Sequence, residues 1–116
     1  MQRKFRLTRS TDFKRVRRTG KSYAHPFVVL VTQVSETPRV RVGVTAGRSV
    51  GGAVQRNRAK RILREAMRPL IPELLPGWDL VLIARPALLS ATLQEVRQVL
   101  TSSLRRAQII SHSDES

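Results

Sequence analysis

Residues 50–68, VGGAVQRNRAKRILREAMR, decide most of what the sequence predicts about the fold. The stretch begins with two glycines typical of a loop and continues with apolar residues at the spacing of an amphipathic helix. At about 100° per residue, one side of this helix collects Ala59, Ile62, Leu63, Ala66 and Met67. Because Pro69 and Pro72 follow, we expect the helix to end at about Arg68.

The other side of this helix is basic. It carries a row of residues that lie four, three and four positions apart, with Lys60 beside them: Asn57, Arg61, Arg64 and Arg68. Such a row spans roughly 16 Å, which matches several phosphates along a nucleic-acid backbone. An idle, solvated helix surface normally mixes acids with its bases, but Glu65 is the only acid of residues 55–68. We therefore interpret the row as a nucleic-acid-binding face.

The flanking segments predict a small sheet and two more helices. We expect a helix over residues 11–18, capped by Ser10 and ended by Gly20; strands over residues 26–34, 39–44 and 79–84; and a helix from the capping box of Thr92 and Glu95 to about Ala107. Residues 39–44 alternate basic and apolar side chains, which predicts a strand with one solvated, positive face. The pattern predicts an α+β fold with two or three strands between the first and second helices, and we expect the order α-β-β-β-α-β-α, a single-domain sandwich of a small central sheet with three helices. We assign it to residues 1–110, with a disordered tail over 111–116.

The composition favours a nucleic-acid partner. The chain has 116 residues, of which 41% are hydrophobic and only 4% aromatic, so the core must consist mainly of Val, Leu, Ile and Ala. Its 22 Lys and Arg against 8 Asp and Glu give a net charge of +14, concentrated in residues 1–21 and 39–68. This charge is typical of proteins that bind a polyanion. No apolar run is long enough to span a membrane, and we expect the protein in the cytoplasm.

The sequence lacks the residues that several classes of function require. The chain has no cysteine, its acids are scattered, and His25 and His112 are not placed to share a metal, so we expect neither a metal site nor an autonomous nuclease. The glycines of residues 47–52 are not followed by Gly-Lys-Ser/Thr, so they do not match the phosphate-binding loop of the P-loop nucleoside triphosphatases. A DNA regulator would need a dimer surface that the sequence does not indicate. A ribosomal protein, or another basic structural RNA-binding protein, stays open as an alternative.

Residues 50–61, VGGAVQRNRAKR, closely resemble the signature of the protein subunit of bacterial ribonuclease P. That signature is a valine or isoleucine, a glycine, a short stretch of small residues, and R-N-R-x-K-R at the start of an arginine-rich helix. The resemblance covers most of the chain, including Asp12-Phe13, Gly20 and residues 41–45 and 82–85. It implies a ribosomal-protein-S5-like fold with a left-handed β-α-β crossover, against the general right-handed rule.

The resemblance also implies a function. Members of this family bind a catalytic RNA that uses Mg²⁺ to remove the 5′ leader of precursor tRNA; the protein itself supplies no catalytic residue and binds no metal or cofactor. No membrane and no obligate protein partner are implied. By position, the residues that match the family's surface toward the catalytic RNA are Arg56, Asn57, Arg58, Lys60, Arg61 and Arg64. We add Arg68, the last residue of the basic row described above. The positions matching a cleft for the leader are Phe13, Arg17, Val31, Arg48 and Arg85.

Two positions depart from the family pattern. Arg17 stands where an aromatic residue is common, and Ser49 stands where a second base often follows the first. We expect the Arg17 guanidinium to stack on a base or to bind a phosphate in place of a ring. Phe13 has a competing interpretation as a core residue. We expect Phe5 and Phe27 to pack in the core and Trp78 to cover its end.

Overall fold

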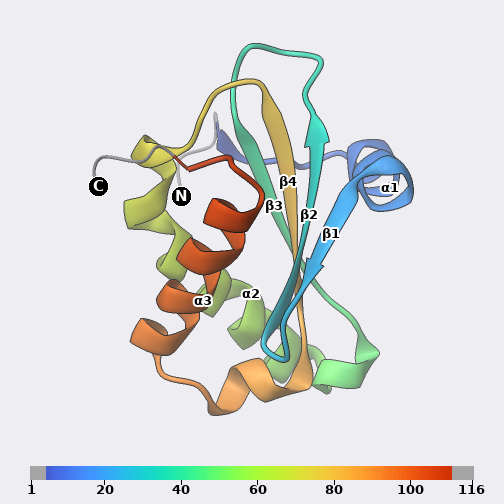
Figure 1. Ribbon diagram of the computed structural model, residues 1–116. Coiled ribbons are helices and arrows are strands. Elements are labelled where there is room, and N and C mark those ends of the chain that lie inside the picture. The colour runs from blue at the N-terminus through green and yellow to red at the C-terminus, as the bar shows by residue number, and fades with distance from the viewer. Residues whose placement is uncertain (1–4, 111–116) are drawn as a thin grey trace.

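A four-stranded mixed sheet forms the centre of the protein, which a computed structural model describes over residues 5–110 (Figure 1). Its strands lie in the order β1 (Lys21–Ala24), β2 (Val28–Val34), β4 (Trp78–Ala84) and β3 (Arg41–Ala46). β2 is antiparallel to β1 and β4, whereas β3 is parallel to β4. A parallel pair needs a crossover connection, and α2 (Ala53–Met67) provides it. The predicted fold class and element order are thus confirmed, and the hand of the crossover stays a prediction.

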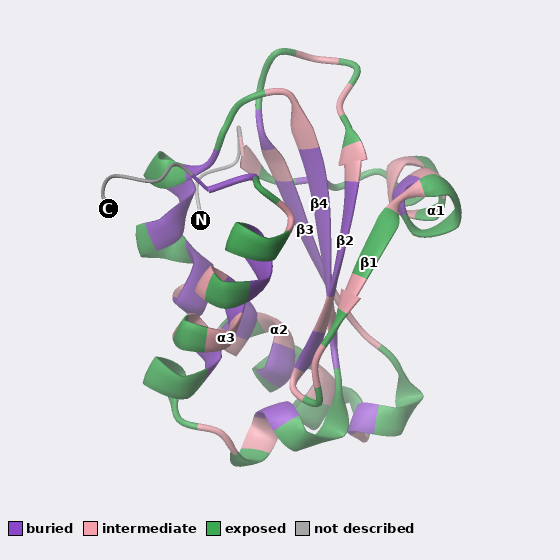
Figure 2. Cartoon of the chain, in the orientation of Figure 1, coloured by how far each residue is buried: buried purple, intermediate pink, exposed green. Residues whose placement is uncertain are grey.

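Helices cover the two faces of the sheet unequally (Figures 1 and 2). α2 and α3 (Leu93–Arg106) lie on one face, where 22 of the described residues form a continuous apolar core. On the other face α1 (Ser10–Thr19) lies over a second, smaller core of Leu7, Val16, Val31 and Val81. Phe5, Phe27 and Trp78 pack against the larger core while staying partly exposed, which confirms their predicted place.

The helices on the larger core follow their sequence patterns closely. Ala59, Leu63, Ala66 and Met67 of α2 are buried and Ile62 is half-buried, as the apolar side of that helix predicts. α3 begins at the predicted capping box. The Thr92 hydroxyl accepts the Glu95 backbone N–H at 3.1 Å, and the Glu95 carboxylate accepts the Thr92 N–H at 2.8 Å. The short helical turns η2 (Arg48–Val50), η3 (Arg68–Glu73) and η4 (Pro86–Ser90) connect these elements.

The start of α1 differs from the prediction. Its N-cap is Arg9, which makes no side-chain capping bond, and Ser10 lies inside the helix, so the predicted serine cap is wrong. Gly20 does end the helix, in an extended conformation with φ −79°. What requires glycine there is space, since a Cβ would lie 2.4 Å from the Val16 carbonyl oxygen and 2.6 Å from that of Thr32. Gly20 thus lets α1 approach β2 closely.

The predicted solvated, positive face of residues 39–44 is also wrong. The strand covers Arg41–Ala46, and Arg41 is half-buried in ion pairs with Asp79 and Asp12. Gly43 is buried because the Phe13 ring lies on it, so closely that a Cβ at Gly43 would lie 2.4 Å from the ring. The alternating pattern identified the strand, but not that α1 would fold over it.

The ends of the chain lie outside the described residues. These are residues 1–4 of the predicted domain and the whole predicted tail over 111–116. None of the helices within residues 5–110 is long and apolar enough to cross a membrane.

Candidate nucleic-acid interface

The basic side of α2 is available to a ligand. We call it the α2 basic face, and it comprises Arg56, Asn57, Arg58, Lys60, Arg61, Arg64 and Arg68. Asn57, Arg58, Arg61 and Arg68 are exposed, and the other three are half-buried. Among the described residues, Arg68 alone of this set has an ion-pair partner, Glu65 at 2.7 Å. No acid of residues 5–110 therefore neutralises the remaining cations of this face.

Arg64 lies in a more enclosed place than the other cations of this face. It lines a cavity of about 200 Å³ together with Arg6, Leu7, Thr8, Phe13 and residues 42–44. Its Nε is buried and has no hydrogen-bond partner within the described part of the chain. Burial, and then the nearby charge of Arg6, lower the pKa of Arg64. An unpaired buried donor is uncommon in proteins, and it favours an anion at this place.

The sheet face under α1 consists of three rows of side chains that the strand register defines. The first, which we call the open row, contains Ala24, Val29, Ile83 and Thr45. Ala24 is exposed and the other three are half-buried, so no helix fully covers them. The covered row contains Val31, Val81 and Gly43, all buried beneath α1. The polar row contains Gln33, Asp79 and Arg41.

The residues predicted to form a cleft come from the α1 side of the sheet and from its end beyond β3 and β4. Phe13 and Arg17 come from α1; Arg48 and Arg85 follow β3 and β4 at the end of the sheet where the open row lies. Val31, however, is 2% exposed and belongs to the covered row, so its predicted contact with a ligand requires α1 to move. The half-buried apolar side chains of the open row are instead Val29 and Ile83. The sequence did not indicate these two residues, because strand alternation does not show which row a helix covers.

Phe13 is shared between core and surface. Its ring packs against Gly43 and the smaller core, and it also lines the cavity beside Arg64. Arg17 is exposed and lies with Lys14 and Arg18 along one shallow depression of α1. Arg48 and Arg85 are exposed as well.

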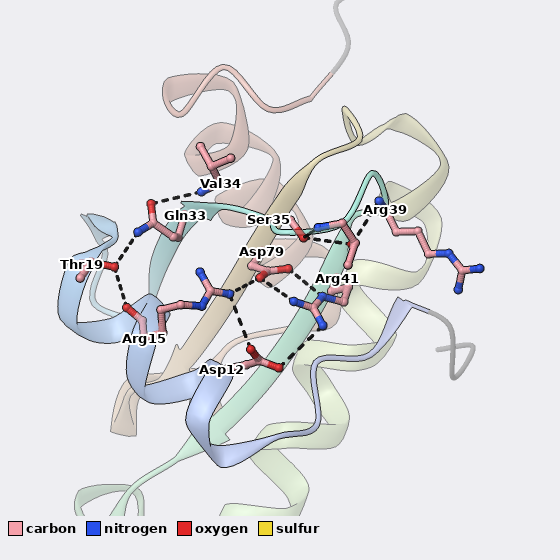
Figure 3. A network of polar contacts seen from close by, with 10 residues as sticks. Asp12, Arg15, Thr19, Gln33, Val34, Ser35, Arg39, Arg41 and Asp79 are labelled. Carbon is pink, nitrogen blue, oxygen red and sulfur yellow. Dashed lines mark hydrogen bonds and ion pairs between the residues drawn. The ribbon is translucent and has the colours of Figure 1, made fainter.

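The polar row ties α1 to the sheet through a buried carboxylate (Figure 3). The Asp79 side chain is fully buried, and it accepts two hydrogen bonds of 2.9 Å from the Arg41 guanidinium and a further one from Arg15 of α1. Asp12 lies 3.8 Å from Arg15 and 3.7 Å from Arg41. Burial alone would raise the pKa of Asp79, but the hydrogen bonds from Arg41 and Arg15 outweigh it and hold that pKa below its usual value.

His25, the histidine within residues 5–110, makes contacts inside the fold. His25 accepts the Phe27 backbone N–H on Nδ1 at 3.0 Å, and its ring lies edge-on to Phe27 with centroids 4.8 Å apart. Within residues 5–110 no three His, Asp or Glu side chains gather as a possible metal-ligand set. His112 lies outside the described residues.

Comparison with known proteins identifies the family. The model of the family described as "Ribonuclease P" matches residues 1–108. The chain belongs to the ribonuclease P protein family. The ribonuclease P protein component of Herpetosiphon aurantiacus is 39% identical over 109 residues, which cover 94% of this chain and 89% of that protein. That of Dehalococcoides mccartyi is 39% identical over 115 residues, covering 99% and 94%.

Solved structures of ribonuclease P proteins share the fold. The Staphylococcus aureus protein superposes with a TM-score of 0.80 at 28% identity, covering 92% of this chain and 98% of that one. The Thermotoga maritima protein superposes with a TM-score of 0.76 at 28% identity, covering 87% and 96%. The resemblance inferred from the arginine-rich signature is confirmed, and the ribosomal-protein alternative is not favoured.

Proposed function

We propose that this ribonuclease P protein binds two RNA partners on two surfaces, which adjoin at the cavity that Phe13 and Arg64 line. The α2 basic face binds the catalytic RNA of the enzyme, and the open row with its flanking residues binds the 5′ leader of precursor tRNA. The RNA carries the cleavage chemistry with Mg²⁺, and the protein acts in the cytoplasm. The observation that carries this proposal is the row of cations on α2 of which, within the described residues, only Arg68 has an ion-pair partner. The half-buried open row, with Arg48 and Arg85 at its end of the sheet, is the second surface.

The character of each surface supports its partner. Unpaired arginines along a helix bind consecutive phosphates, and an RNA phosphate at Arg64 would give its buried Nε an acceptor. The open row offers a narrow apolar floor, an aromatic ring at one side and arginines at its ends. Unpaired bases stack on such rings while arginines bind the backbone, which suits a single strand rather than a duplex.

The carboxylates near the groove support the assignment of the chemistry to the RNA. Asp12 and Asp79 both lie on the α1 side of the sheet, and both are ion-paired with Arg15 and Arg41. The Asp79 carboxylate, which is buried and accepts hydrogen bonds from two guanidiniums, is a weak base and is not free to bind a metal ion or to accept a proton from water.

Reconstitution tests the proposal. We expect RNA-free protein to leave precursor tRNA intact in Mg²⁺, and we expect the protein with its cognate RNA to cleave at the mature 5′ end. Cleavage by the protein alone would contradict the RNA-borne chemistry. The two surfaces are tested by binding: Phe13→Ala should weaken affinity for precursor tRNA by roughly fivefold or more while mature tRNA, which has no leader, binds as before. Equal weakening for both RNAs would contradict the leader groove.

A further inference from the structure

α1 has little apolar contact to hold it. The helix itself contributes one fully buried side chain, Val16, and one half-buried ring, Phe13, to the smaller core of Leu7, Val31 and Val81. A helix seated on so few apolar side chains can rotate about its axis or shift unless polar contacts fix it. Its orientation matters because α1 carries Phe13 and Arg17.

Within residues 5–110, the side-chain polar contacts that join α1 to the sheet lie on one of its flanks. At about 100° per residue, Asp12, Arg15 and Thr19 fall on one side of Val16, whereas Phe13 and Arg17 fall on the other. The first flank contacts the polar row strand by strand (Figure 3). Thr19 accepts a hydrogen bond from Gln33 of β2, Arg15 pairs with Asp79 of β4, and Asp12 lies 3.7 Å from Arg41 of β3.

This arrangement sets the position of the opposite flank. The helix lies across the strands, with Val16 against the covered row and one flank attached to the polar row. The other flank must then face the opposite way: its Phe13 ring lies on Gly43 at the β3 end of the covered row, and Arg17 lies on the side of the open row. Asp79 is central to the attachment because it is fully buried and accepts hydrogen bonds from both Arg15 and Arg41.

We propose that Asp79 is a positioning residue for leader binding: it holds Arg15, fixes the rotation of α1 about Val16, and so sets the positions of Phe13 and Arg17. Asp79 lies in the polar row, and the covered row separates it from the open row. It therefore acts on leader binding only through α1. The inference rests on the proposed binding of the leader at the open row. This role could not be inferred from the sequence, because the ion pairs of Asp79 with Arg15 and Arg41 form only in the folded protein.

The test is the affinity of the reconstituted enzyme for precursor tRNA relative to mature tRNA. We expect Asp79→Asn to reduce this ratio at least about fivefold, as the loss of one stacked base would. Affinity for the catalytic RNA should stay unchanged, since α2 lies on the other face of the sheet. The substitution makes the protein more positive, so a purely electrostatic effect would strengthen precursor binding; weaker binding therefore reports the position of α1.

Two further variants keep the proposal falsifiable. Leu100→Ala lowers stability from the α2 and α3 face without touching α1, so it should keep the wild-type ratio at a temperature where the variants are folded. Arg15→Gln removes the helix end of the ion pair at a partly exposed site, and should reduce the ratio in the same direction as Asp79→Asn, whereas Arg18→Gln removes the same charge from the exposed side of α1 and should reduce it less.

The possible outcomes separate the two proposals. If folded Asp79→Asn and Arg15→Gln proteins keep the wild-type ratio, the positioning role is wrong and leader binding stands. An equal loss in Leu100→Ala would also overturn the role, because general destabilisation would then explain it. If the wild-type enzyme does not prefer precursor tRNA to mature tRNA, leader binding at the open row fails, and this inference fails with it.

Discussion

The two faces of the sheet are stabilised by different interactions. On the α2 and α3 face, 22 buried apolar residues form one core, and none of the charged residues of these two helices is fully buried. On the α1 face, four buried apolar residues share the contact with a buried carboxylate and two arginines. Apolar burial is non-directional, whereas the hydrogen bonds of the second arrangement hold one helix in one orientation. The difference indicates that one face supplies stability and the other supplies geometry.

The largest effect should come from the apolar face. Leu82 of β4 is fully buried between Leu30 and Val44, its partners in the sheet register. Leu82→Ala should lower the free energy of unfolding by about 2–5 kcal/mol through the cavity it leaves. Urea denaturation measures this loss.

The smaller core gives the counterpart to this prediction. Val16→Ala should speed amide exchange in α1 while the amides of α2 keep their protection. If both helices lose protection together, the two faces are not separable.

The ion pairs of the α1 face should make stability depend on acid. The pKa of Asp79 is lower in the folded chain than in the unfolded one, so the unfolded chain binds more protons as the pH falls. The stabilisation is therefore complete above about pH 4, the usual pKa of an aspartate, and is lost as the pH falls through the depressed value. Asp12, Arg15, Arg41 and Ser35 are the groups facing Asp79, and Glu36 acts on Arg41 from farther away.

Comparison of two proteins measures this contribution. Asp79→Asn should lower the free energy of unfolding by about 2–3 kcal/mol at neutral pH, because it leaves the guanidiniums of Arg15 and Arg41 without their shared carboxylate. The difference from the wild type should shrink toward pH 2. A difference that stays constant between pH 7 and pH 2 would assign the acid dependence to other carboxylates.

A backbone contact sharpens the comparison at intermediate size. Gly20→Ala should cost about 1–3 kcal/mol, because the new methyl group meets the carbonyl oxygens of Val16 and Thr32, which cannot rotate away. Gly47→Ala is the matched control, since nothing lies within 4 Å of a Cβ at that glycine. Thermal denaturation distinguishes the two. Equal losses would mean that α1 does not depend on its close approach to β2.

The smallest effect on stability should come from the α2 basic face. Arg61→Ala should change the free energy of unfolding by less than about 0.5 kcal/mol, because the side chain is exposed and makes no ion pair in the described structure. Binding to the catalytic RNA should weaken, and its salt dependence should become shallower by about one phosphate contact. Arg105→Ala removes an exposed charge from α3 and should leave the salt dependence unchanged. Equal slopes for both variants would contradict the assignment of the interface.

The sequence predicted the elements better than their contacts. The apolar stripe of α2 and the capping box at Thr92 are local patterns, and both were confirmed. β1 has only four residues and no buried one, so alternation could not place it. The ion pairs of Asp79 join α1, β3 and β4, and no spacing along the chain indicates them. For the same reason, nothing local distinguished Val31, under α1, from Val29 at its edge.

The Arg15–Asp79 ion pair also bears on the order in which the molecule is assembled. It joins residues 64 positions apart, and β4 is the strand that completes the sheet between β2 and β3. During synthesis α1 leaves the ribosome long before the carboxylate that holds it, and in refolding this contact must wait for the closure of a long loop. Before β4 is present, α1 can contact β2 through Thr19 and Gln33 and β3 through Asp12 and Arg41, but it lacks the carboxylate that Arg15 and Arg41 share. The attachment of α1 to the centre of the sheet is therefore completed last.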